Sequence, residues 1–173
     1  MVTFLLVITA AAAAAYTDFT SRKIPNALVL VLLAAAVFLQ AMHGWSSLGI
    51  ALAAGVAVFL LGTLGFVLGW MGGGDVKFLA AGAVALGWPD AVMFVLYTLA
   101  AGGVLAIAGS ALRGRLGLLV RNLYFMSTGV ISGAGFVAPV ESAGRVPYAF
   151  AILAGAVISA ITSLPHFKMG ISS

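Results

Sequence analysis

The chain has 173 residues, of which 64% are hydrophobic and only 7% are charged, and its net charge is +4. Soluble domains carry about 25% charged residues, so this chain could not cover a water-facing surface and a soluble globular protein is excluded. The basic excess therefore does not indicate nucleic-acid binding, and no nucleic-acid partner is expected. The composition predicts an integral membrane protein with little mass outside the bilayer.

Uncharged apolar runs follow one another along almost the whole sequence. A helix needs about 20 apolar residues to cross a hydrocarbon core of ~30 Å, and these runs lack the polar and apolar alternation of an outer-membrane barrel. We expect a single domain over residues 1–173, an all-α bundle of about six transmembrane helices with a short fourth helix. The runs are residues 1–17, 24–40, 48–70, 91–112 and 146–164, with a shorter one at 78–87.

The first run is interpreted as a retained membrane span. It lacks the positively charged start of a signal peptide and leads directly into a charged loop; a cleaved leader is the alternative. The sequence has no cysteine, which excludes disulfides and thiolate metal sites. His43 and His166 lie far apart at predicted helix ends and are expected at the membrane interface, so we expect neither a metal nor a cofactor.

The basic residues predict which loops face the cytoplasm, because Lys and Arg accumulate in cytoplasmic loops. Seven of the eight Lys and Arg residues lie after the first run, between the run at 48–70 and the short run at 78–87, or in the stretch 113–145. The intervening loops hold only His43 and Asp90 as ionisable residues, and the tail holds His166 and Lys168. This alternation places both termini outside and puts Asp18 and Asp75 on the cytoplasmic side. The residues that carry the argument are Arg22, Lys23, Lys77, Arg113, Arg115, Arg121 and Arg145.

A charged loop is predicted at residues 18–26. Pro25 has no N–H group and disfavours the α conformation at Ile24, so one continuous helix cannot form there. We expect Asn26 to cap the second helix. Arg22 and Lys23 are either topology anchors or partners for a functional group.

The GGGD sequence at residues 72–75 interrupts the apolar pattern. Each glycine costs about 1 kcal/mol in a helix relative to alanine, so the chain is predicted to unwind here. A helix over residues 76–87 would be about 18 Å long, which is shorter than a bilayer. We expect the turn to be recessed into the membrane, where irregular backbone is tolerated if it is buried or lines a water-filled cavity; the alternative is that Pro89 and Asp90 are drawn inward.

The longest polar stretch, residues 113–145, separates the last two runs. Its first part mixes arginines with leucines at roughly helical spacing, which predicts an interfacial segment lying in the membrane plane. The remainder is a glycine-rich loop that could be a mobile cover or a substrate guide. Glu141 is interpreted as solvated.

Asp18 and Asp75 are two of only four acidic residues. Acidic side chains at membrane depth are costly and are by default functional. Two neighbouring carboxyls that share one proton can hydrolyse an amide: the ionised group takes a proton from water, and the neutral group donates to the substrate carbonyl. The alternatives are a helix cap for Asp75 and an ion pair of Asp18 with Arg22 or Lys23.

Two motifs, in this order, resemble those of a known family. The first, D-x3-R-x-IPN, is formed by Asp18, Arg22, Ile24, Pro25 and Asn26, and the second, GxGD-x-K, by Gly72, Gly74, Asp75 and Lys77. Together they resemble the type IV prepilin peptidases, which are GxGD intramembrane aspartyl proteases. The stretch Arg145-Val146-Pro147 is similar to the one that leads into that family's final helix.

The resemblance implies a multi-pass aspartic endopeptidase of the bacterial inner membrane. It would remove the short basic leader of prepilins or pseudopilins at the cytoplasmic face, just before their hydrophobic helix. By the same resemblance, Asp18 and Asp75 are catalytic. The active-site loop is Gly72, Gly73 and Gly74, and the supporting residues are Arg22, Pro25, Asn26 and Lys77.

The chain departs from larger family members, which carry an added cytoplasmic domain with paired cysteines and also methylate the new pilin N-terminus. It has no cysteine and no room for that domain, so it resembles the compact, peptidase-only type associated with Flp-like tight-adherence pili. Two other functions stay open: a small ion or proton transporter that uses the same acids, and a non-catalytic pilus-assembly scaffold.

Overall fold

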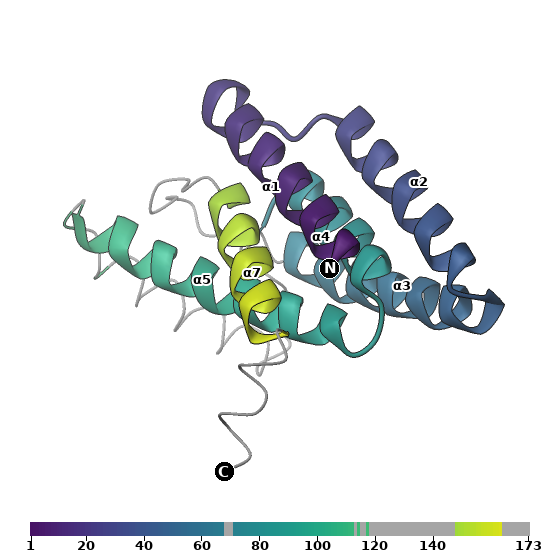
Figure 1. The fold of residues 1–173 in the computed structure, drawn as a ribbon. Coiled ribbons are helices and arrows are strands. Elements are labelled where there is room, and N and C mark those ends of the chain that lie inside the picture. Colours follow the sequence, from purple (N-terminus) through teal and green to yellow (C-terminus); the bar gives the residue numbers. More distant parts are fainter. Residues whose placement is uncertain (68–70, 113, 115–116, 118–147, 164–173) are drawn as a thin grey trace, which may run out of the picture.

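A computed structural model describes residues 1–67, 71–112, 114, 117 and 148–163 of the chain. Within these residues the protein is a bundle of six α-helices without strands (Figure 1). The all-α prediction with a short fourth helix is therefore confirmed, whereas the expected interfacial segment lies almost wholly outside the described residues. The helices are α1 (Val2–Ser21), α2 (Asn26–Met42), α3 (Trp45–Val67), α4 (Gly73–Leu86), α5 (Asp90–Leu112) and α7 (Ala149–Thr162).

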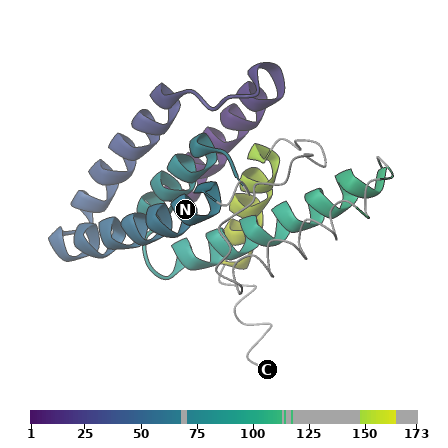
Figure 2. The same cartoon turned by 180° about the vertical axis from the view of Figure 1, so that it is seen from behind.

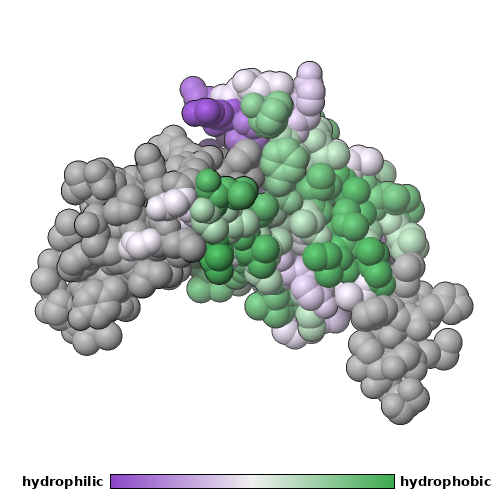
Figure 3. Space-filling view, turned by 90° about the vertical axis from the view of Figure 1, so that its left-hand side faces the viewer, coloured by the Kyte–Doolittle hydropathy of each residue, from purple (hydrophilic) through white to green (hydrophobic). Residues whose placement is uncertain are grey.

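Three of these helices, α1, α3 and α5, are long and apolar enough to cross a membrane, and α2 and α7 are apolar but shorter. Large side chains on the outside of the bundle, such as Phe38 and Leu61, are more than half exposed. Figure 3 shows this apolar surface, with a hydrophilic patch at the top, the end at which α1 leads into α2 in Figure 1. Such a surface belongs in lipid, and the chain is a membrane protein.

The short helix α4 is the core of the bundle. It packs against each of the other five described helices (Figures 1 and 2), and most of its residues are buried. Close approach depends on small residues: Val84 and Val76 of α4 fill the space that side chains at Gly55 and Gly62 of α3 would need. Because neighbouring helices surround α4, its 14 residues do not have to span a bilayer by themselves.

The first loop is shorter than expected. α1 continues to Ser21, so Asp18 lies in its last turn, and Arg22 ends the helix in the left-handed conformation with φ 53°. The residue that precedes α2 is Pro25, and Asn26 makes no capping hydrogen bond. The predicted capping role of Asn26 is therefore wrong; the φ of proline already suits the start of a helix, and the Asn26 side chain has another partner.

The glycines before Asp75 unwind less than expected. α4 begins at Gly73, so only Gly72 of the three lies outside the helix. The first N–H groups of any helix lack intrahelical partners, and close packing favours glycine here, since a Cβ on Gly74 would lie 3.3 Å from the Ile24 Cβ. The propensity argument missed this tertiary contact. The third helix also starts earlier than the apolar run at 48–70 predicted, because α3 begins at Trp45.

The opposite end of α4 is tied down by Gln40. Its Nε2 donates to the carbonyls of Val84 and Ala85, at 3.2 and 3.1 Å, and its Oε1 accepts a 2.8 Å bond from Ser47 Oγ. Position 89 is proline, so the Ala85 carbonyl has no N–H donor four residues further on. The buried glutamine supplies that donor and joins α2, α3 and α4.

Candidate active site

Asp18 reaches the site from the last turn of α1, where it is half-buried. The helix that carries it is lined with buried alanines at positions 10, 11, 14 and 15. Their small side chains allow neighbouring helices to approach closely, and α1 packs against α2, α4 and α7. The alanine tract thus places the end of α1 beside the central helix.

Asp75 is the third residue of α4 and is also half-buried. Its Oδ2 accepts a 3.1 Å hydrogen bond from the backbone N–H of Gly72. The carboxylate therefore satisfies one of the N–H groups that the helix start leaves free, as the capping alternative proposed. This bond engages only Oδ2, so the capping contact and a chemical role are compatible.

The structure brings together the two helix ends that carry the carboxyls. Asp18 lies in the last turn of α1 and Asp75 in the first turn of α4, and Ile24, which follows Asp18, contacts Gly74, although the two acids are far apart in sequence. The loop charges had predicted that both belong to the same end of the bundle, and the structure places them there. Which side of a membrane this end faces stays a prediction.

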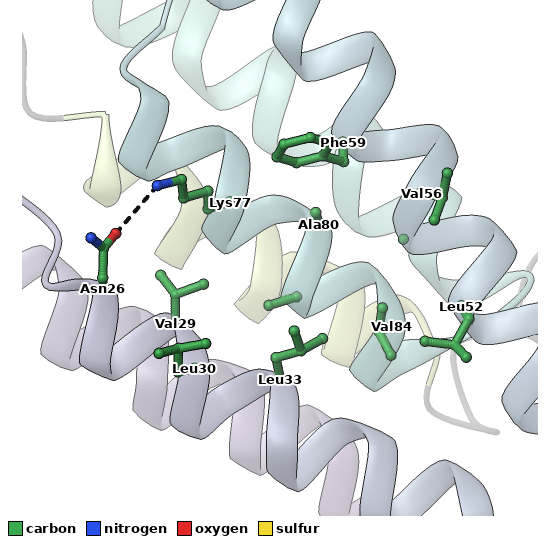
Figure 4. A pocket seen from close by; sticks show the side chains of 12 residues that line it. Asn26, Val29, Leu30, Leu33, Leu52, Val56, Phe59, Lys77, Ala80 and Val84 are labelled. Carbon is green, nitrogen blue, oxygen red and sulfur yellow. Dashed lines mark hydrogen bonds between the residues drawn. The ribbon is translucent and has the colours of Figure 1, made fainter.

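Two contacts join the two motifs directly. Gly74 packs against Ile24, whose Cβ would lie 3.3 Å from a Cβ on Gly74. The Lys77 Nζ donates a 3.4 Å hydrogen bond to Asn26 Oδ1 (Figure 4). Ile24 and Asn26 follow Asp18 in the chain, and Gly74 and Lys77 flank Asp75. The contacts therefore hold the start of α4 against the segment that leaves α1.

The three glycines have different surroundings. A Cβ on Gly72 would lie 2.9 Å from Asp75 Oδ2, whereas a Cβ on Gly73 would make an ordinary 3.5 Å contact with Phe66. Gly72 thus leaves the room that the carboxylate occupies. The remaining predicted residues, Arg22 and Pro25, are exposed in the α1–α2 connection.

Tyr148, to which the sequence reasoning gave no role, also lies at this end. It immediately precedes α7, which packs against α1 and α4, and it is half-buried. Its ring packs against α5, where a Cβ on Gly102 would lie only 2.6 Å from a ring carbon. The sequence feature that could have identified Tyr148 is its position directly after the Arg145-Val146-Pro147 stretch.

Comparison with known families decides the assignment. The model of the type IV leader peptidase family matches residues 5–107, a range that contains both motifs and both acids. The chain belongs to the type IV leader peptidase family. The resemblance drawn from the two motifs is thereby confirmed, and membership in this family makes the chain a protease and hence a hydrolase. Searches of curated proteins and of solved structures found no match.

Proposed function

We propose that this leader peptidase is an aspartic endopeptidase whose catalytic pair is Asp18 and Asp75. The observation that carries the proposal is that the segment after Asp18 packs against the first turn of α4, which carries Asp75, through the Ile24–Gly74 contact and the Lys77–Asn26 hydrogen bond. In the proposed mechanism the two carboxyls share one proton, as neighbouring carboxyls do. The contacts between the two motifs keep the pair in place.

The proposed reaction needs only these two groups and water. The ionised carboxylate takes a proton from a water molecule, and the oxygen of that water attacks the scissile carbonyl carbon. At the same time the neutral carboxyl donates its proton to the carbonyl oxygen. In the second step the newly protonated group gives its proton to the leaving amine. The other group recovers a proton from the diol as the C–N bond breaks, so the pair ends with the single proton it began with.

The substrate class that we propose is the prepilins or pseudopilins, cut between a short basic leader and an apolar helix. The family supports leader removal, and an apolar outer surface next to a polar end suits a substrate that enters from the membrane. We place the pair on the cytoplasmic side because of the loop charges, and the family resemblance implies a bacterial inner membrane. Because the chain has no cysteine, we propose the compact, peptidase-only type without methyl transfer.

The test is co-expression with a candidate prepilin, with leader removal scored by electrophoretic mobility. Asp18→Asn and Asp75→Asn should each abolish processing while the protein stays inserted, since asparagine keeps the size and, at position 75, can still accept the Gly72 N–H bond. Asp90→Asn is the matched control, because Asp90 lies at the start of α5 and accepts a bond from Ser163.

Processing that survives in either active-site variant would refute the paired mechanism. Ion flux across proteoliposomes without cleavage would favour the transporter instead. Pilus loss in a null strain but not in the aspartate variants would favour the scaffold.

A further inference from the structure

An apolar groove opens between α2, α3 and α4 (Figure 4). Its volume is about 570 Å³, within the range of roughly 300–1,000 Å³ that ligand sites occupy. Leu30 lines the groove and is 64% exposed. The principal lining side chains are Leu30 and Leu33 of α2, Val56 and Phe59 of α3, and Ala80 and Val84 of α4.

The groove has one polar end, which lies near the start of α4, the helix end that carries Asp75. Lys77 and Asn26, which are hydrogen-bonded to each other, are polar residues in an otherwise apolar lining. Lys77 follows Asp75 by two positions on α4, so the polar end of the groove lies within one helical turn of Asp75 along the helix axis, although the two side chains are on different faces of the helix. From Lys77 to Val84 the helix rises about 10 Å, so the groove leads away from the site over roughly two helical turns.

We propose that this groove receives the first turns of the substrate's apolar helix, the segment that follows the scissile bond; the inference rests on the proposed function. An apolar helix recognised in a groove presents one face of side chains spaced by three and four residues, and two turns of such a face match the length available. The small, half-buried residue Ala80 in the lining lets that face approach α4 closely.

Charge decides which substrate segment, the leader before the scissile bond or the apolar helix after it, enters the groove. The ammonium group of Lys77 at the polar end repels a basic leader, whereas the apolar interior offers no partner to lysine or arginine side chains, whose burial without a counter-charge is costly. The leader therefore stays outside the groove. The apolar helix alone is complementary to the groove, and its start is then held at the end of α4 that carries Asp75.

The first experiment fills the groove. Phenylalanine at the half-buried lining residue Ala80 should occupy the space of a substrate side chain, and Ala100→Phe on the exposed side of α5 is the matched control. We expect Ala80→Phe to slow cleavage of a full-length prepilin at least tenfold, mainly through KM. A peptide that ends two residues after the scissile bond cannot reach the groove, and its cleavage should stay within twofold.

The second experiment does not depend on the filled variant folding. A photo-crosslinking amino acid at Leu30, in the Asp75→Asn background that cannot cut, should capture the apolar helix of the co-expressed prepilin. The same probe at Leu96, a similarly exposed residue of α5, should not. Failure of the wild-type protein to cut the prepilin would count against the proposed function itself. Normal cleavage combined with crosslinks from Leu30 only to lipid or to a second copy would overturn the groove proposal alone.

Discussion

Gly72 has backbone angles of φ −78° and ψ 151°, which any residue can adopt. What sets the position apart is space, because a Cβ there would lie 2.9 Å from the Asp75 oxygen that accepts the Gly72 N–H bond. An added methyl group must push this carboxylate aside. Gly73 has no such constraint, since its nearest neighbour, Phe66, is at an ordinary contact distance.

Alanine substitutions at these two glycines should therefore have different effects on leader cleavage. Gly72→Ala is expected to lower the rate of leader cleavage tenfold to a hundredfold, because a displacement of about 1 Å at a catalytic group can cost ~10²-fold. Gly73→Ala should keep near-normal cleavage and raise the free energy of unfolding by up to about 1 kcal/mol, since alanine is the better helix former. Cleavage rates and thermal unfolding in detergent measure both effects. Equal loss of activity in the two variants would show that the loop needs glycine flexibility rather than room.

Single residues of the site could be predicted from the sequence only where their chemistry is rare in this composition. Asp18 and Asp75 stood out because charges are scarce in the chain. The bond between Lys77 and Asn26 could not be predicted, because it joins two helices whose relative placement no local pattern reveals. Asn26 was accordingly assigned to the nearest helix start instead of to its partner on α4.

At the scale of elements, the end of α4 away from the site depends on one side chain from another helix. Gln40 donates to two carbonyls of the last turn of α4 and accepts from Ser47, and Pro89 withholds a donor that a continuing helix would have supplied. The sequence contained two separate signals for this, a lone glutamine in one apolar run and, far from it in the sequence, a proline after the fourth helix. Pairing the two required the fold.

Removing this donor should destabilise the bundle. Gln40→Leu leaves two buried carbonyls short of a partner, and an unsatisfied buried group costs about 1–3 kcal/mol, so the thermal unfolding midpoint in detergent should fall. Ser47→Ala removes only the second bond and should cost less, and the double variant should be no worse than Gln40→Leu alone. Additive losses would mean that Ser47 stabilises α3 independently of Gln40.

The contact between α5 and α7 offers the opposite case, a stabilising substitution. Thr98 Oγ1 and Ser159 Oγ are buried without a hydrogen-bond partner in the described part of the chain, and Thr98 presses on Gly155, with its backbone N only 2.7 Å from where a Cβ would stand. Thr98→Val keeps the shape and removes the unpaired hydroxyl. We expect the free energy of unfolding to rise by about 1 kcal/mol.

A matched control is Thr63→Val on α3, whose hydroxyl donates a 2.7 Å bond to the Phe59 carbonyl. It should bring no gain in thermal unfolding measured under the same conditions. A loss of stability in Thr98→Val would reveal a partner for the hydroxyl.

At the scale of the whole molecule, composition predicted the class of fold and charge predicted which helix ends belong together. The structure agrees, in that the ends of α1 and the starts of α2 and α4 meet. The central position of α4 was not predicted, because every helix in the chain is apolar and the pattern does not say which one the others surround. The start of α4 was predicted too late in the sequence, because close packing at Gly73 and Gly74 outweighs the low helix propensity of glycine.

The orientation in the membrane is the remaining whole-molecule prediction, and the absence of native cysteine makes it directly measurable. Ser21 and Ser46 are both exposed and lie near opposite ends of the bundle. If the basic loops are cytoplasmic, a membrane-impermeant maleimide added to intact cells should label Ser46→Cys, whereas Ser21→Cys should react only after permeabilisation. Labelling of both variants in permeabilised cells controls for access, and the unsubstituted protein should never react. The reversed pattern would place Asp18 and Asp75 on the outer face, where a leader that stays in the cytoplasm could not reach them.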